Sequence, residues 1–164
     1  MQAKIRKMYV EAIETFQKDK RIILEAIREP GNLNKFHPFC KMNTVENWPG
    51  IGSVDYIEYL NGLKYKRKFK KWDDTGYELE IGKNRKLANV HWVVEGNKTE
   101  SSLSVRINPI LPYKSKTKAW FMWHFYIKHK MQAYINNVLW GFKHYINTET
   151  IVEHNKFGKH SWFS

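Results

Sequence analysis

Two neighbouring segments of the chain carry the residues whose types and spacing most suggest chemistry. Tyr56 and Glu58 alternate with other residues in the first segment, and Tyr65 and Arg67 do so in the second. A carboxylate or an imidazole can act as a general base, and a tyrosine hydroxyl can donate a hydrogen bond to a developing enolate. The catalytic candidates are therefore Glu58 or His124 as the base and Tyr56 or Tyr65 as the donor.

The turn between these segments decides which way their side chains face. Asn61-Gly62 is a strong signal for a β-hairpin with a two-residue loop. Such a loop places Glu58 opposite Tyr65 and directs both Glu58 and Arg67 into the interior. Two inward charges are costly unless they are paired, hydrated or used, which favours a polar site there. The alternative is a structural ion pair, and for His124 the alternative is a hydrogen-bonded packing residue.

Cysteine and histidine provide little evidence for other chemistry. Cys40 is the only cysteine, and it follows His37 by three residues. These two types occur together in thiol catalysis, but a small buried hydrophobe is the stronger interpretation of Cys40. The seven histidines show no spacing typical of metal ligands. We therefore expect no metal and no cofactor.

A run of lysines occupies the alternate positions of the second segment: Lys64, Lys66, Lys68 and Lys70. Alternation directs these lysines to the face opposite Tyr65 and Phe69, so lysines and aromatic rings cannot act together on one nucleic-acid strand. The lysines favour a solvated surface, with weak contact to a polyanion or an anionic membrane as the alternative, and no specific nucleic acid.

Length and composition indicate one globular domain. The 164 residues are 42% hydrophobic and carry a formal net charge of +12. Such a chain can bury a core, which excludes intrinsic disorder as its main state. No apolar run approaches the roughly 20 residues that span a bilayer, and the first residues lack the apolar block of a signal peptide. We expect a cytoplasmic protein with one domain over residues 1–164.

Hydrophobic periodicity predicts the order of the elements. A strand over 5–16 precedes a short helix over 19–28 and a helical turn over 32–37. Antiparallel strands follow up to residue 107, since alternating apolar positions are separated by short turns. Residues 115–146 then show helical spacing, with no proline and one glycine. Residues 147–164 are a C-terminal tail that wraps back onto the body or moves freely.

The order of the elements over nearly the whole chain, and residues 10–39, which read VEAIETFQKDKRIILEAIREPGNLNKFHPF, resemble those of a known superfamily. The SRPBCC, START-like or birch-pollen-allergen-like proteins open with a strand and a helix of the form V-W-x-x-L, then D-P-x-N-L and an aromatic residue before W-x-P. The matching positions here are Ile23, Leu24, Ile27, Glu29-Pro30-Gly31-Asn32-Leu33 and Phe36-His37-Pro38. The acidic-Ala-Pro segment before the helix is replaced by Thr15-Phe16-Gln17-Lys18. The resemblance implies an α+β helix-grip fold, with a curved antiparallel sheet wrapped around one long C-terminal helix.

The resemblance also implies a ligand cavity between sheet and helix, because members of the superfamily bind or transfer lipids and sterols, cyclise polyketides, or activate chaperone ATPases. Inward residues of the strands and helix would line it; the alternative is that they form a filled core. The expected ligand-binding residues are Tyr56, Glu58, Tyr65, Arg67, Phe69, Tyr77, Leu79, Trp92, Leu103, Val105, Trp123, Ile127, Met131 and Val138.

We therefore expect the chain to bind or transport a small hydrophobic or amphipathic molecule, lipid-like or polyketide-like. A polyketide cyclase/dehydrase-like enzyme is the first alternative. The second is a protein- or polyanion-interaction module that uses the lysine strand. No feature of the sequence indicates the ligand's identity or an oligomeric state.

Overall fold

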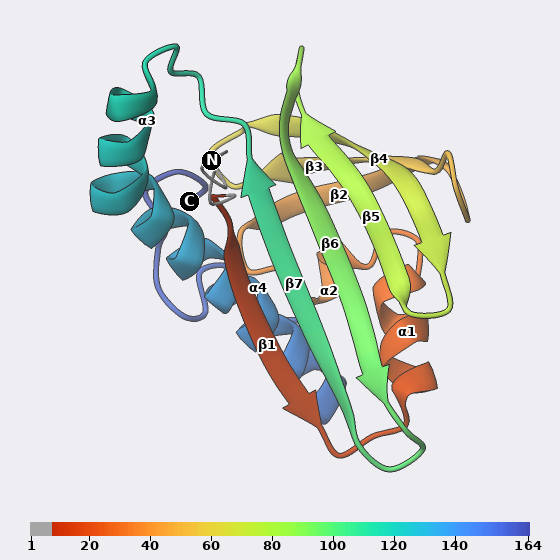
Figure 1. Ribbon diagram of the computed structural model, residues 1–164. Helices are drawn as coiled ribbons and strands as arrows, with labels where there is room; N and C mark the ends of the chain where they lie inside the picture. The colour runs from red at the N-terminus through yellow and green to blue at the C-terminus, as the bar shows by residue number, and fades with distance from the viewer. Residues whose placement is uncertain (1–7) are drawn as a thin grey trace, which may run out of the picture.

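A computed structural model describes residues 8–164 as a seven-stranded antiparallel sheet with helices packed on one face (Figure 1). The strand order is β1-β7-β6-β5-β4-β3-β2. The elements are β1 (Val10–Phe16), α1 (Lys20–Arg28), α2 (Leu33–Phe36), β2 (Cys40–Asn47), β3 (Val54–Tyr59), β4 (Lys64–Asp73), β5 (Gly76–Gly82), β6 (Lys86–Gly96), β7 (Ser101–Pro109), α3 (Lys116–Met122), η1 (Trp123–Ile127) and α4 (Lys128–Thr148). The expected α+β helix-grip architecture is confirmed, although β1 begins at Val10; residues 5–7 of the expected strand lie outside the described residues.

Helix α1 forms where the sequence predicts it, and its ends are capped by side chains. The Asp19 carboxylate accepts a hydrogen bond from the backbone N–H of Arg21 at 2.8 Å, which satisfies one of the unpaired donors of the first turn. At the other end the Asn32 amide donates to the carbonyl oxygen of Ile27 at 2.7 Å. Ile23 and Ile27 are fully buried, so the helix covers part of the sheet with its apolar face.

The β3–β4 hairpin differs from its prediction by one residue. Its loop has three residues, 60–62, because Gly62 N–H donates to the carbonyl of Tyr59 at 2.9 Å and Tyr59 N–H donates to the carbonyl of Leu63 at 2.8 Å. Gly62 has φ +86°, which fits a type I turn followed by a left-handed glycine. The extra loop residue places Asp55, not Tyr56, opposite Arg67. The inner face of β3 is therefore Asp55, Ile57 and Tyr59.

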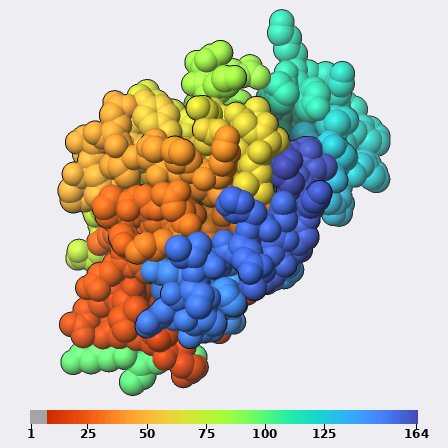
Figure 2. Space-filling model, turned by 180° about the vertical axis from the view of Figure 1, so that it is seen from behind, coloured from red at the N-terminus to blue at the C-terminus, as the bar shows by residue number. Residues whose placement is uncertain are grey.

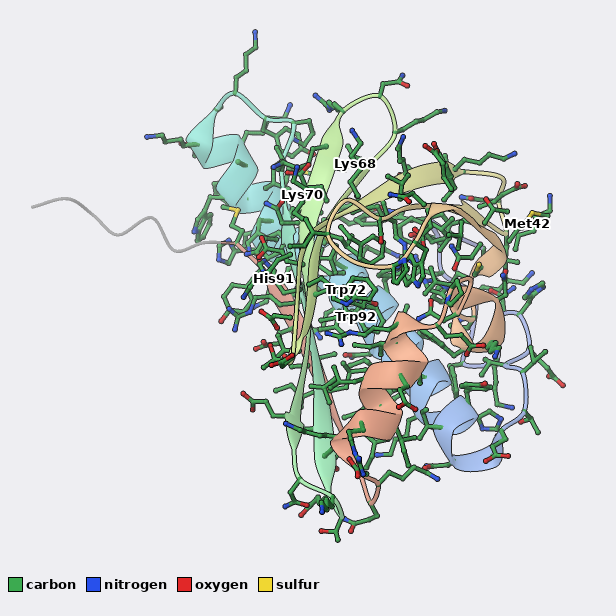
Figure 3. All side chains as sticks on the ribbon, turned by 90° about the vertical axis from the view of Figure 1, so that its right-hand side faces the viewer. Met42, Lys68, Lys70, Trp72, His91 and Trp92 are labelled. Carbon is green, nitrogen blue, oxygen red and sulfur yellow. The ribbon has the colours of Figure 1, made fainter. Side chains whose placement is uncertain are left out.

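A bulge in β4 keeps several aromatic side chains in the interior. Phe69 pairs with Leu79 but Lys71 pairs with Glu78, so Lys70 is the extra residue. The phase change turns Trp72 to the same side as Phe69, where the ring centroids lie 5.7 Å apart. Figure 3 shows Trp72 and Trp92 on the side of the sheet that faces the helices.

The predicted long helix forms, but a π-helical turn interrupts it. Helix α3 begins with a hydrogen bond from Lys118 N–H to the Ser115 hydroxyl, and α4 ends before Glu149, which has φ +57°. Between them, Lys128 N–H donates to the carbonyl of Trp123, five residues back. Gly141 lets α4 lie close to α2, since a Cβ there would be 2.1 Å from a carbonyl oxygen of Phe36.

The C-terminal residues pack against the body. Val152 N–H donates to the carbonyl of Lys35 at 2.9 Å, and Asn155 N–H donates to that of Pro38 at 2.9 Å. Further along, the Phe163 ring stacks on Tyr59 at 4.4 Å between centroids. Figure 2 shows the C-terminal end of the chain, in dark blue, between the yellow β3–β4 region and α3. The segment expected as a tail therefore forms part of the wall of the interior.

Candidate functional site

A cavity of about 380 Å³ lies between the sheet and the long helix. Its walls are the inner faces of β3 to β7, the helix from Met122 to Val138, the loop 109–113 and the C-terminal Trp162 and Phe163. Most of the lining is apolar, and none of the lining residues is Asp or Glu. This volume and character suit a small molecule with little charge.

The cavity has an open end and a closed end. Half-exposed or exposed lining residues gather where β7 leads into the helix: Ile110, Pro112, Tyr113, Met122 and Tyr126. The lining at the other end is buried and includes Leu33, His37, Tyr59, Arg67 and Trp92. The exposed end of the cavity therefore lies beside the start of the helix, and the buried end lies toward α2.

A hydrogen-bonded chain of three side chains stands at the closed end. Phe39 N–H donates to His37 Nδ1 at 3.2 Å, so the neutral imidazole carries its hydrogen on Nε2. His37 Nε2 lies 2.9 Å from the Tyr134 hydroxyl, to which it donates. The Tyr134 hydroxyl in turn lies 3.0 Å from the hydroxyl of Tyr59.

These three side chains have more polar hydrogens than the hydrogen bonds they form with one another. His37 supplies one N–H, and Tyr134 and Tyr59 each supply one O–H, but the three groups share only two hydrogen bonds. One hydroxyl hydrogen of the pair therefore has no acceptor among the described residues. Both tyrosines line the cavity. The site thus offers one hydrogen-bond donor to a molecule inside it.

Burial keeps all three groups uncharged. It lowers the pKa of His37 to about 3, helped by the nearby positive charge of Arg67. Burial also raises the pKa of Tyr134 to about 12 and that of Tyr59 well above its ordinary value. At neutral pH the chain consists of neutral donors and acceptors, so it would select a neutral polar group.

Arg67 enters the cavity wall as half of a buried ion pair. Its Nε donates to Asp55 Oδ1 at 2.7 Å, and its Nη2 donates to Asp55 Oδ2. Burial alone would lower the pKa of Arg67, but the adjacent carboxylate of Asp55 raises it. Asn43 Nδ2 also donates to Asp55 Oδ2, at 3.2 Å. The pair is neutral as a unit, so Arg67 has little charge left to attract an anion.

The structure brings eight of the predicted ligand-binding residues to the cavity wall: Tyr65, Arg67, Leu79, Trp92, Val105, Ile127, Met131 and Val138. Four others are buried without lining it: Phe69, Tyr77, Leu103 and Trp123. The prediction that Tyr56 and Glu58 face inward is wrong, because the three-residue loop turns both to the outer face of β3.

Three of the four catalytic candidates, Tyr56, Glu58 and His124, lie away from the cavity. Glu58 accepts hydrogen bonds from Lys41 and Lys64, which lower its carboxyl pKa. His124 is exposed on η1, with Nδ1 2.8 Å from the carbonyl oxygen of Trp120. Tyr65 alone lines the cavity, where burial raises its pKa.

The remaining chemical candidates are placed as follows. The Cys40 thiol lies 4.0 Å from Asn34 Oδ1, and burial raises its pKa to about 12, so it is a protonated thiol at neutral pH. Within residues 8–164, no three His, Cys, Asp or Glu side chains gather closely enough to hold a metal ion. The same part of the chain has no helix long and apolar enough to cross a membrane.

The lysine strand faces outward, as alternation predicts, and some of its charge is paired. Lys64 lies 3.1 Å from Glu58, and Lys66 lies 3.9 Å from Glu46. Lys68 and Lys70 are exposed without an ion pair among the described residues (Figure 3). This face is therefore only moderately basic.

Three residues of the site, His37, Tyr59 and Tyr134, are not among the ligand-binding residues expected from the sequence. Tyr134 falls on the apolar stripe of the predicted helix, which is a usable signal for an inward side chain. Tyr59 was missed because the predicted register of β3 turned it to the outer face, whereas the structure places it inside. For His37, nothing in the local sequence indicates a partner 97 residues away.

The comparisons with known proteins concern the fold. No family model and no curated protein matches the sequence. The structure is similar to that of DynU16, a protein of the dynemicin biosynthetic locus, with a TM-score of 0.65 and 11% identity over 88% of this chain; the chain spans about half of DynU16, 49% of its length. The structure of KanY is also similar, with a TM-score of 0.60 and 18% identity over 84% of this chain and 97% of KanY. The structure of Ara h 8.0201 matches with a TM-score of 0.52 and 15% identity, over 82% of this chain and 97% of Ara h 8.0201. The chain therefore has the helix-grip fold of the SRPBCC, or birch-pollen-allergen-like, proteins.

Proposed function

We propose that this protein binds a small, neutral, largely apolar molecule that carries one hydrogen-bond acceptor, such as a ketone or an ester. The proposal rests on the one hydroxyl donor of the Tyr59–Tyr134 pair that has no acceptor among the described residues, at the closed end of an apolar cavity. Binding an acceptor there satisfies the donor, whereas a pure hydrocarbon leaves it unsatisfied.

The charge distribution supports a neutral ligand. Arg67 is already paired with Asp55, and the cavity lining contains no Asp or Glu. An anionic headgroup at the closed end would lose its hydration without gaining an unpaired cation. We therefore expect the carboxylate of a fatty acid to bind more weakly than a ketone of the same length.

A displacement titration tests the proposal. The protein is loaded with the neutral fluorophore N-phenyl-1-naphthylamine and titrated with dodecane, 2-dodecanone and dodecanoate. The expected order of affinity places the ketone first, by about fivefold to tenfold over the hydrocarbon, which corresponds to one net hydrogen bond. Equal affinity for all three molecules would show that the tyrosine pair does not select an acceptor.

A variant that fills the cavity provides the matched control. Ala88 is buried on β6 and lines the cavity, so Ala88→Phe should place its ring in the empty volume and abolish probe binding. Filling a true cavity costs little stability, whereas inserting a ring into a packed core costs roughly 1–3 kcal/mol. Unchanged probe binding in a folded Ala88→Phe protein would contradict the proposed site.

A further inference from the structure

Helix α3 and the π-turn η1 expose a cluster of large aromatic side chains. No residue of α3 is buried, and the exposed fractions are 48% for Trp120, 52% for Phe121 and 70% for Phe125. The rings pack on one another: Phe121 and Phe125 stack at 5.7 Å, and Trp120 meets Phe121 edge-on at 5.2 Å. Such a patch is unusual on a surface that only meets water.

Positive charge surrounds this cluster. Five lysines lie in the same stretch: Lys114, Lys116, Lys118, Lys128 and Lys130. The sequence has no Asp or Glu between Glu100 and Glu149, nor in residues 1–7. Within residues 8–164 none of the five lysines forms an ion pair. The cluster and these lysines together are named the aromatic-lysine surface.

The aromatic-lysine surface borders the open end of the cavity. Met122 and Tyr126, from the same two helical segments, line that cavity, as do Ile110 and Tyr113 from the preceding loop. Ile110 is itself 47% exposed. Figure 1 shows α3 projecting from the body beside the end of β7. The entrance and the exposed rings therefore belong to one region.

We propose that the aromatic-lysine surface docks on an anionic lipid bilayer. Aromatic rings on a helix favour the boundary between headgroups and acyl chains, and lysines next to them attract anionic headgroups. Docking in this way covers the exposed rings of Trp120, Phe121 and Phe125. It also turns the cavity entrance toward the acyl chains, so an apolar ligand can exchange with the bilayer instead of crossing water.

Other occupants fit this surface less well. A symmetric contact with a second copy would bring the same unpaired lysines together, because a two-fold interface repeats one patch on both sides. A single-stranded nucleic acid needs open ring faces, but Phe121 and Phe125 each cover part of one face of the other. The exposed aliphatic Ile110 also gains nothing from a base. A bilayer uses all of these features.

Vesicle flotation of the full-length protein tests the docking. Vesicles of phosphatidylcholine alone are compared with vesicles that also contain phosphatidylglycerol. We expect binding to the anionic vesicles, weakened by salt because the Debye length falls from about 10 Å at 0.1 M to 3 Å at 1 M. The triple variant Trp120→Ala, Phe121→Ala, Phe125→Ala should bind at least about tenfold more weakly, since three exposed rings lose their burial.

Two matched controls separate docking from general effects. Trp140→Ala removes a ring that is 44% exposed on α4, outside the aromatic-lysine surface, and should leave flotation unchanged. Replacing Lys114, Lys116 and Lys118 by Gln should reduce binding more than replacing Lys64, Lys68 and Lys70. Neither the three rings nor these lysines line the cavity, so probe binding without vesicles should persist in the variants. This readout distinguishes failure of docking from failure of the proposed ligand site.

Several results would overturn the proposal. The protein could fail to float with anionic vesicles, or float equally well with neutral ones. The aromatic triple variant could bind as well as the wild type, or the two lysine variants could lose binding equally. Retained binding only to single-stranded nucleic acid would assign the surface to a different partner. As a second measurement, brominated lipids should quench the wild-type fluorescence more than that of Trp120→Phe. Equal quenching would place Trp120 outside the bilayer.

Discussion

His37 should make the stability of the protein fall as the solution becomes acidic. Its pKa is lowered from 6.5 to about 3 in the folded state, so between these values the unfolded chain binds more protons than the folded one. Stability therefore rises with pH in this window and falls as the pH drops. The slope reaches about 1.4 kcal/mol per pH unit, and the full shift corresponds to about 5 kcal/mol.

The window just below pH 6.5 isolates this effect from the carboxylates. Glu58, Glu80 and Asp73 have pKa values below their ordinary values because they accept hydrogen bonds, so their contributions stay constant until the pH approaches 4.5. Burial also lowers the pKa of His160, which contributes in the same direction. A difference between the wild type and a His37 variant is therefore required.

Urea unfolding followed by tryptophan fluorescence supplies that difference. Between pH 6.5 and 5 the wild type should lose roughly 2 kcal/mol more than His37→Gln, which keeps an amide donor and acceptor but does not titrate. Parallel curves for the wild type and His37→Gln would refute the argument that His37 is a buried, neutral donor to Tyr134.

Three substitutions test the packing around the site, each by urea unfolding at neutral pH. Tyr134→Phe removes two hydrogen bonds and leaves the imidazole N–H without an acceptor, so we expect a loss of about 2–4 kcal/mol; a loss below about 1 kcal/mol would mean that the chain is not formed. Asp55→Leu leaves the guanidinium of Arg67 buried and unpaired and should lower the free energy of unfolding by about 3–5 kcal/mol. The double variant Asp55→Leu, Arg67→Met should lose much less; losses that simply add would contradict the pairing. Gly141→Ala should destabilise by at least about 1–3 kcal/mol, because its Cβ meets a backbone carbonyl of α2 at 2.1 Å; a stabilised variant would contradict the close approach.

The order of elements was predictable from the sequence, because each strand and helix carries its own periodicity. The alternation of β4 correctly directed Tyr65, Arg67 and Phe69 inward. Which side chains of β3 face inward was not predictable from the sequence, because a change of one residue in the loop length reverses the facing of the strand. Asn61-Gly62 is compatible with both a two-residue and a three-residue loop, and the structure has the latter.

The polar centre of the site could not be predicted because it is assembled from distant segments. His37 follows α2, Tyr59 ends β3 and Tyr134 lies on α4. Each residue alone has the appearance of an ordinary packing residue, and only the fold brings their polar atoms within about 3 Å of one another. The C-terminal Phe163 completes the same wall by stacking on Tyr59, a contact that no local pattern indicates.

Native mass spectrometry of the purified full-length protein tests the central claim most directly. We expect a discrete adduct that dissociates on denaturation and whose extract is a neutral, apolar molecule with a carbonyl, ester or other acceptor. The Ala88→Phe protein, prepared in parallel, should lack the adduct. An adduct that persists in the Ala88→Phe protein, or a wild-type protein that neither carries an adduct nor takes up 2-dodecanone, would contradict the proposed ligand site.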